Sequence, residues 1–237
     1  MNTQDNQYKN ILLITTKKGN ENLVKQHIES KKTKQFLKDK SNIIILAYGG
    51  AKKTHLKDAE ERIKELHIYT KEQYKSLSTK TYKAIQFLVK NLKFKTLHKA
   101  DDTKLIPDFY NFNVTKDYGG WYNNKKRGRK YINMFKIRKD WPIDPTELIF
   151  EGLKKSDKKF FLRWASKKNI KVDPWFYKEV YYSSWKPYFI SYKFAEIISK
   201  GGEGYDKMYT EKLGGCEDHM IGRMFNDLSL FANLNSQ

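Results

Sequence analysis

The sequence predicts an α/β fold, in which a central sheet is flanked by helices. Two apolar runs rich in β-branched residues, 11–16 and 43–47, are typical of buried strands. A third strand is predicted at 94–98, and stretches with apolar residues at helical spacing separate the three. Strands that alternate with helices along the chain favour a mostly parallel sheet.

Three helices are predicted in the first half, over 21–38, 56–66 and 77–93, because each stretch places apolar residues three and four positions apart. The second of them is polar, and a short extended piece is expected after it at 67–69. Together with the strands, these helices define the predicted α/β unit.

The second half is less regular, and its predicted elements are shorter. In order, we expect a glycine-bearing turn, strands in an aromatic-rich stretch, a short helix and an amphipathic helix, at 117–122, 160–191, 194–199 and after 214–219. The apolar face of the last helix consists of Met220, Ile221, Met224 and Phe225. No internal repeat or domain linker interrupts the chain.

Charge and composition narrow the class of protein. The net charge of +20 indicates an anionic partner such as a nucleotide, a nucleic acid or an anionic surface. Only six of the 47 basic residues are arginine, the side chain on which base-reading proteins depend. The densest basic cluster, 125–130, is either a solvated loop or a contact for phosphate or an anionic acceptor.

The single cysteine, Cys216, excludes a disulfide framework and a cysteine-rich zinc site. The N-terminus is polar, and the apolar run after it is too short to cross a bilayer. We therefore expect a soluble, cytoplasmic protein without a signal peptide or transmembrane segment.

Two adjacent carboxylates, Asp101 and Asp102, follow the predicted strand 94–98. Ligands of α/β sheets bind beyond the carboxyl ends of the strands, which is where these residues are expected. Adjacent carboxylates repel one another, and a magnesium or manganese ion would compensate them while binding phosphate oxygens. A solvated Asp-Asp turn explains the same two residues without a ligand.

Four segments, in the right order, resemble the β-1,3-galactosyltransferase superfamily, glycosyltransferase family 31, which includes the core-1 and Fringe enzymes. Residues 74–81 are similar to the family's Tyr-x-Asn-Leu-Thr-x-Lys-Thr, and residues 99–103 (Lys-Ala-Asp-Asp-Thr) resemble its Lys-x-Asp-Asp-Asp. Residues 182–191 resemble Tyr-x-Ser-Gly-Gly-x-Tyr-Val-Leu-Ser, and residues 217–222 (Glu-Asp-His-Met-Ile-Gly) match Glu-Asp-Val-x-x-Gly. The resemblance extends over about residues 11–230.

This resemblance implies a single domain of the GT-A nucleotide-sugar transferase fold over residues 1–237. Its nucleotide-binding half would cover about 11–110, and its acceptor-binding and catalytic-base half about 111–230. The implied reaction moves a sugar of the GlcNAc, Gal, Glc or Xyl type from a UDP-sugar to a hydroxyl of a glycan or glycoprotein. The configuration at the anomeric carbon is inverted to a β-linkage, and Mn²⁺ or Mg²⁺ assists.

The resemblance also implies roles for individual residues. It places the catalytic base on Asp218, whereas Glu217 either orients that base or caps the helix. The expected nucleotide-sugar contacts are Thr15, Thr16, Lys17, Lys80, Asp101 and Asp102. The expected acceptor contacts are Tyr182, Trp185 and Tyr188.

The acidic motif is one carboxylate shorter than that of the family, so two alignments are possible. Without a gap, Thr103 replaces the final acid, which is the family's main protein ligand to the metal. With a one-residue deletion, Asp102 becomes that final acid. We favour the deletion, with Asp102 as the metal ligand, because a threonine hydroxyl lacks the charge to hold a divalent ion alone. Asp101 would then contact the donor ribose or orient Asp102.

Other departures concern the acceptor side and the ends of the chain. The family's glycines before Tyr188 are replaced by Trp185, Lys186 and Pro187, which would reshape the acceptor site. The family's cysteines and the membrane anchor of its Golgi members are absent, which would suit a member from a bacterium or a large DNA virus.

Two alternatives to an active transferase stay open. A basic nucleic-acid-binding protein is consistent with the net charge of +20, and its affinity would fall steeply with salt. A degenerate transferase fold that binds glycans without turnover is consistent with the shortened acidic motif.

Overall fold

Four parallel strands form the centre of the fold. The protein is described here by a computed structural model that covers residues 7–73, 76–122, 183–200, 217–232 and 234. The central strands are β1 (Gln7–Thr15), β2 (Asn42–Tyr48), β4 (Ile63–His67) and β5 (Lys93–Asp101). β1 lies between β2 and β5, and β4 lies on the outer side of β2. The parallel pairing predicted from strand–helix alternation is confirmed for the three predicted strands, β1, β2 and β5.

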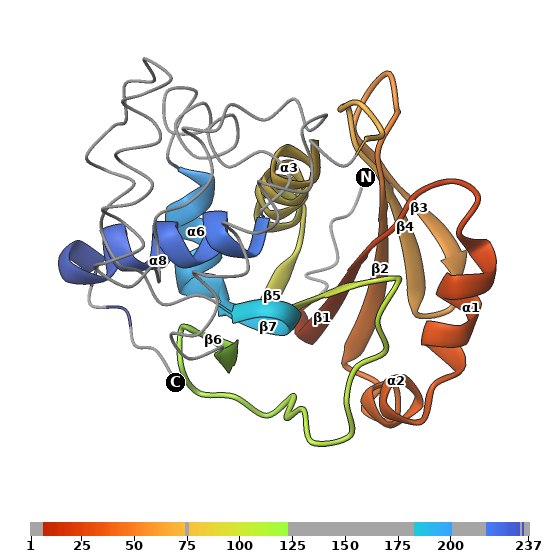
Figure 1. The fold of residues 1–237 in the computed structure, drawn as a ribbon, viewed down its shortest axis with the longest axis horizontal. Coiled ribbons are helices and arrows are strands. Elements are labelled where there is room, and N and C mark those ends of the chain that lie inside the picture. Colours follow the sequence, from red (N-terminus) through yellow and green to blue (C-terminus); the bar gives the residue numbers. More distant parts are fainter. Residues whose placement is uncertain (1–6, 74–75, 123–182, 201–216, 233, 235–237) are drawn as a thin grey trace, which may run out of the picture.

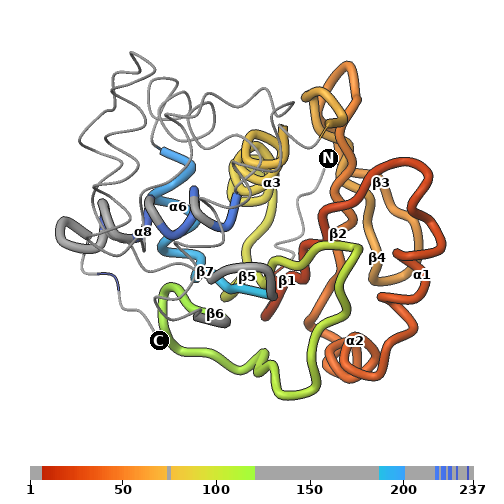
Figure 2. Tube along the Cα trace, viewed as in Figure 1, coloured from red at the N-terminus to blue at the C-terminus, as the bar shows by residue number. Residues whose placement is uncertain are grey.

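Antiparallel strands extend this centre on both sides. β3 (His55–Glu60) pairs with β4, β7 (Ser183–Ser191) pairs with β5, and β6 (Tyr118–Tyr122) pairs with β7. The described residues thus form a seven-stranded mixed sheet in the order β3-β4-β2-β1-β5-β7-β6. Figure 2 shows how β7 returns from late in the sequence to lie beside β5.

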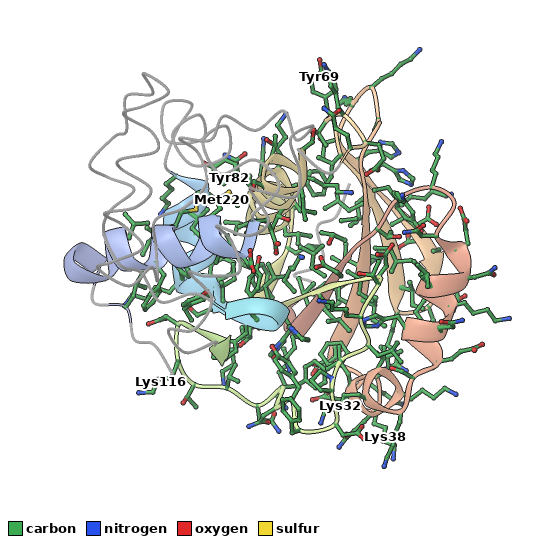
Figure 3. The ribbon with its side chains drawn as sticks, viewed as in Figure 1. Lys32, Lys38, Tyr69, Tyr82, Lys116 and Met220 are labelled. Atoms are coloured by element: carbon green, nitrogen blue, oxygen red, sulfur yellow. The ribbon has the colours of Figure 1, made fainter. Side chains whose placement is uncertain are left out.

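Helices cover both faces of the sheet (Figure 1). α1 (Glu21–Glu29) and α2 (Lys31–Phe36) pack on one face, where Val24 and Phe36 join a core built on the β1 and β2 side chains. The other face carries α3 (Leu77–Asn91), α6 (Tyr192–Ser199) and α8 (Glu217–Ala232). In Figure 3, Tyr82 of α3 and Met220 of α8 lie close together, and both belong to this second core.

The carboxyl ends of β1, β2, β4 and β5 meet at one side of the sheet, which we call the carboxyl edge. Thr15 at the end of β1 is in register with Ala47 of β2 and with Asp101 of β5. Because parallel strands share a direction, the loops after these strands gather at this edge. The fold thereby brings the predicted donor-binding segments of the first half together.

The predicted helix over 56–66 is wrong, because this segment forms the hairpin of β3 and β4. Ile63 and Leu66 have helical spacing, yet they are buried on opposite faces of the sheet, where β4 pairs with Ile44 and Ala47 of β2. The backbone N–H and C=O groups along the edge of β2 form hydrogen bonds with β4. This pairing overrides the helical spacing of the apolar residues in 56–66.

Two other predicted elements differ in detail. The helix expected over 21–38 is divided into α1 and α2 at Ser30, whose hydroxyl accepts a hydrogen bond from the Thr33 backbone N–H and so caps the second helix. The turn expected at 117–122 is mostly strand β6. The strands predicted at 11–16, 43–47 and 94–98 and the helix predicted at 77–93 are confirmed to within a few residues.

The last helix is confirmed, since Met220, Ile221, Met224 and Phe225 of α8 are all buried as its apolar face requires. Of the aromatic stretch 160–191, only β7 belongs to the described residues. No helix in the described part of the chain is long and apolar enough to cross a membrane.

Candidate active site at the carboxyl edge

The adjacent carboxylates at the end of β5 point to different neighbours. Asp101 lies on the same side of β5 as Lys99, two residues earlier, and the Lys99 ammonium contacts its Oδ1 atom. Asp102 contacts the loop between β1 and α1 instead, through Thr16 and Asn20. The side chain of Asp101 is 39% exposed, whereas the whole Asp102 residue is 7% exposed. Asp101 is therefore the more accessible of the two acids.

Lys99 joins the end of β5 to the start of α8. Its Nζ atom lies 2.8 Å from Oε1 of Glu217, the first residue of α8, while it also contacts Asp101. The contact with Glu217 is an ion pair rather than an aligned hydrogen bond, because Oε1 has no hydrogen-bond partner of suitable geometry in the described residues. The Lys99 side chain is 3% exposed and that of Glu217 is 6% exposed, so the pair is buried.

One residue of β1 and a further acid of α8 complete this group of side chains. The Thr15 hydroxyl donates a hydrogen bond of 2.7 Å to Oδ1 of Asp101. Asp218 follows Glu217 in the first turn of α8 and is partly buried. We call Thr15, Lys99, Asp101, Glu217 and Asp218 the edge cluster.

The electrostatics of the edge cluster follow from burial and pairing. Burial opposes the charged form of Lys99, but the carboxylates of Asp101 and Glu217 outweigh it and raise the Lys99 pKa. Burial likewise works against ionised Asp101, yet Lys99 and Thr15 lower its pKa. Asp101 and Lys99 are thus charged partners near neutral pH.

Glu217 behaves differently from Asp101. Burial raises the pKa of Glu217 to about 7 against the attraction of Lys99, and the neighbouring carboxylates of Asp101 and Asp218 act in the same direction as burial. One ammonium cannot fully compensate three carboxylates in a buried setting, so the least exposed carboxyl holds a proton most readily.

Tyr188 closes the buried side of the edge cluster. It stands on β7 in register with Lys99, and the residue is 2% exposed. Burial raises the pKa of its hydroxyl well above the usual value, and the negative charge of the Glu217 carboxylate raises it further. The residue predicted as an acceptor contact therefore lies in the core beside Glu217, and that prediction stays untested.

Asp102 anchors the loop after β1. Its Oδ2 atom accepts hydrogen bonds of 2.6 Å from the Thr16 hydroxyl and 2.7 Å from the Asn20 side-chain amide. The Asp102 backbone N–H also donates to the Thr15 carbonyl, at 3.2 Å. These contacts fix the loop that carries Lys17, which is exposed at the turn.

The contacts of Asp102 do not fit the predicted metal ligand. A hard cation requires several oxygen acceptors around it, whereas Oδ2 of Asp102 already accepts hydrogen bonds from two donors, Thr16 and Asn20. Within the described ranges, no group of three or more His, Cys, Asp or Glu side chains is placed to hold a metal ion. The expected Mn²⁺ or Mg²⁺ stays a prediction.

Lys80 is buried beneath the same edge and connects three segments. Its Nζ atom donates to the Thr16 carbonyl at 2.8 Å and forms an ion pair of 2.7 Å with Glu72. The other carboxylate oxygen of Glu72 accepts a hydrogen bond from the Gly49 backbone N–H, after β2. The ammonium of Lys80, predicted as a nucleotide-sugar contact, thus already supports the loops that surround the edge.

The structure brings together most, but not all, of the predicted site residues. Thr15, Thr16, Asp101, Asp102 and the Glu217–Asp218 pair gather at the carboxyl edge. Trp185 belongs to β7, but its side chain is not among the described ones. Tyr182 and the basic cluster 125–130 lie outside the described residues.

Sequence reasoning missed three residues that organise this edge. Lys99 was part of the acidic motif, and its spacing of two from Asp101 on a strand could have indicated their shared side. Asn20 lies in the loop between β1 and α1, and no sequence pattern indicates that its side-chain amide reaches Asp102. No sequence pattern indicated a role for Glu72, because its partners Lys80 and Gly49 come together only through the tertiary fold.

A pocket of about 190 Å³ lies at the other end of the strands. Lys9 and Asn42, near the starts of β1 and β2, line it together with Lys32 of α2 and Phe112. Figure 3 places Lys32 and Tyr69, which follows β4, at opposite ends of the molecule. Asn10 and Asn42 of this pocket bond to each other, and Lys32 bonds to the Asp108 carbonyl, so these groups are already partnered.

We expect Asp102 to stabilise the loop between β1 and α1. Asp102→Ala should lower the free energy of unfolding by roughly 3 kcal/mol, because Thr16 and Asn20 lose a charged acceptor. Thr103→Ala, at the exposed neighbouring position, is the matched control and should change stability by less than about 0.5 kcal/mol. Urea unfolding of the two variants measures the difference, and equal stabilities would contradict the anchoring role.

The buried carboxyl of Glu217 should make stability depend on pH. A group whose pKa is raised on folding contributes stability that is present below its ordinary pKa of 4.5 and is lost as pH rises through about 7. Glu217→Gln should therefore gain stability relative to the wild type between pH 4.5 and 7. Unfolding curves across this range test the effect, with Glu196→Gln on α6 as the control. A pH-independent difference for Glu217→Gln would contradict it.

Comparison with known proteins does not assign the chain to a family. No protein-family model matches the sequence, and no curated protein matches it either. The functional proposal consequently rests on the residues at the carboxyl edge and on the sequence segments that contain them.

Proposed function

We propose that the chain is an inverting glycosyltransferase with a GT-A type fold. It would move a sugar of the GlcNAc, Gal, Glc or Xyl type from a UDP-sugar to a hydroxyl of a glycan or glycoprotein, with formation of a β-linkage. Support comes from the seven-stranded mixed sheet with helices on both faces, and from the four segments that resemble glycosyltransferase family 31.

One observation carries the proposal. The segment that resembles the family's acidic motif and the segment that resembles its Glu-Asp motif are far apart in the sequence, yet they meet through Lys99, which contacts both Asp101 and Glu217. Two such motifs are expected to meet in a transferase, because the base must hold the acceptor hydroxyl next to the anomeric carbon of the bound donor. A chance resemblance gives no reason for this contact.

In the proposed reaction, the carboxylate of Asp218 takes the proton of the acceptor hydroxyl. The acceptor oxygen attacks the anomeric carbon from the side opposite to the diphosphate and forms the new glycosidic bond. The bond between the anomeric carbon and the diphosphate oxygen breaks, and UDP leaves with the electron pair. Thr15, Thr16, Lys17 and Asp101, on the donor side of the edge, are the proposed contacts of the nucleotide and its sugar.

A UDP-release assay with several UDP-sugars tests the proposed function directly. It should be run with glycan and glycoprotein acceptors, once with Mn²⁺ or Mg²⁺ and once with chelator. Acceptor-dependent UDP release is the expected result. UDP or glycan binding without release under any condition would favour a domain that binds without turnover, and the absence of both would refute the transferase.

Asp218→Asn should abolish transfer while UDP binding persists. The amide cannot accept the acceptor's proton, and loss of a general base costs on the order of a hundredfold or more in rate. Calorimetry with UDP and the release assay separate binding from turnover. Near-normal turnover in Asp218→Asn would move the role of base to another residue, for which the buried Glu217 is the first candidate.

The net charge of +20 favours nucleic-acid binding as the second candidate function. If the transferase proposal holds, duplex DNA and RNA should bind weakly, and this binding should disappear at moderate salt. UDP-sugar, in contrast, should raise the melting temperature, as a ligand specific for the folded state does. Filter binding at several salt concentrations and thermal shift measure the two effects. Tight, sequence-selective DNA binding at physiological salt would overturn the enzyme.

A further inference from the structure

Lys99 has no assigned part in the chemistry proposed above, although its ammonium lies between the two acidic segments. It is 3% exposed, it contacts Asp101 at the end of β5, and it lies 2.8 Å from Glu217 at the start of α8. The buried ring of Tyr188 stands next to it in register on β7. Lys99 thus belongs to the sheet, whereas one of its two partners belongs to a helix from the other end of the chain.

Because both side chains are buried, separating Lys99 from Glu217 costs free energy. A charge removed from water is tolerated only when it is paired, and loss of one partner leaves the other charge uncompensated. An outward movement of the first turn of α8 would separate Glu217 from Lys99 while the Lys99 ammonium stays buried. The position of that turn is consequently coupled to the ion pair, and Asp218, the next residue, moves with it.

We propose that Lys99 is a positioning residue, which sets the place of Asp218 relative to Asp101 by holding Glu217 at the amino end of α8. The assignment of Asp218 as the base rests on the proposed function, but the placement of α8 by Lys99 does not. A positioning residue of this kind touches neither donor nor acceptor. Its removal should therefore affect turnover more than nucleotide binding.

Hydrogen exchange tests the placement without any assumption about activity. In an α-helix the amides of residues 221–225 donate to the carbonyls of residues 217–221, so they report on the first turn of α8. We expect these amides to exchange at least about tenfold faster in Lys99→Met than in the wild type, because the turn opens more often. Lys95→Met, on the same strand but exposed, is the matched control and should exchange like the wild type.

A second variant tests the same contact if Lys99→Met does not fold. Glu217→Ala removes the carboxyl that Lys99 contacts, whether or not this carboxyl holds a proton, and it should accelerate exchange at the same amides by a smaller factor, about threefold. Unchanged exchange at residues 221–225 in a folded Lys99→Met, or in Glu217→Ala if Lys99→Met does not fold, would overturn the proposal.

Kinetics provide the second readout. Lys99→Met should lower kcat by at least about tenfold, while the Kd for UDP changes less than about threefold. The double variant Lys99→Met/Glu217→Ala should be no slower than the slower single variant, since the two residues act as one unit. A merely structural contact would lower the melting temperature and leave kcat per folded molecule unchanged, and that result would overturn the proposal.

The two readouts separate this inference from the proposed function. If the wild type transfers no sugar from any donor, the proposed function fails, and the exchange of α8 alone decides on Lys99. If the wild type is active and Lys99→Met shows wild-type exchange and kcat, only the inference about Lys99 fails.

Discussion

The ion pair of Lys99 with Glu217 is the contact on which the arrangement of the carboxyl edge depends. The end of β5 and the first turn of α8 come from opposite halves of the chain, and the ammonium of Lys99 lies between their carboxylates. Breaking a buried pair by removing one partner typically costs about 3–5 kcal/mol. Such a contact adds little net stability compared with apolar packing, but it penalises every arrangement that separates its members. It therefore specifies where the helix begins relative to the sheet.

A second set of contacts divides the roles of the adjacent acids. Asp101 belongs to the edge cluster and keeps 39% of its side chain exposed, whereas Asp102 is buried and holds the loop after β1 through Thr16 and Asn20. Beneath that loop, Lys80 and Glu72 connect it with the segment after β2. The side of the edge that we assign to the donor is thus built from fixed loops. The side that carries the proposed base is placed by the buried apolar face of α8 and by the Lys99–Glu217 ion pair.

Much of the fold could be predicted because its signals are local. The β-branched runs of β1 and β2 and the helical stripe of α3 depend on side-chain periodicity alone. The hairpin of β3 and β4 could not be predicted, because its strands are stabilised by pairing with β2 rather than by their own pattern. For the site, the motifs indicated that Asp101 and Glu217 belong together, but no sequence pattern indicates that Lys99 joins them. The side to which Asp102 points depends on how β5 ends, which periodicity does not determine.

We propose that the carboxyl edge binds the nucleotide of a UDP-sugar, and backbone amide shifts measured during a titration with UDP test this binding. The largest changes are expected around Thr15, Thr16 and Asp101, with smaller changes in the first turn of α8. Changes centred on the pocket that contains Lys9, Asn42 and Phe112, at the other end of the strands, would contradict it. A spectrum unchanged at saturating UDP would contradict it as well.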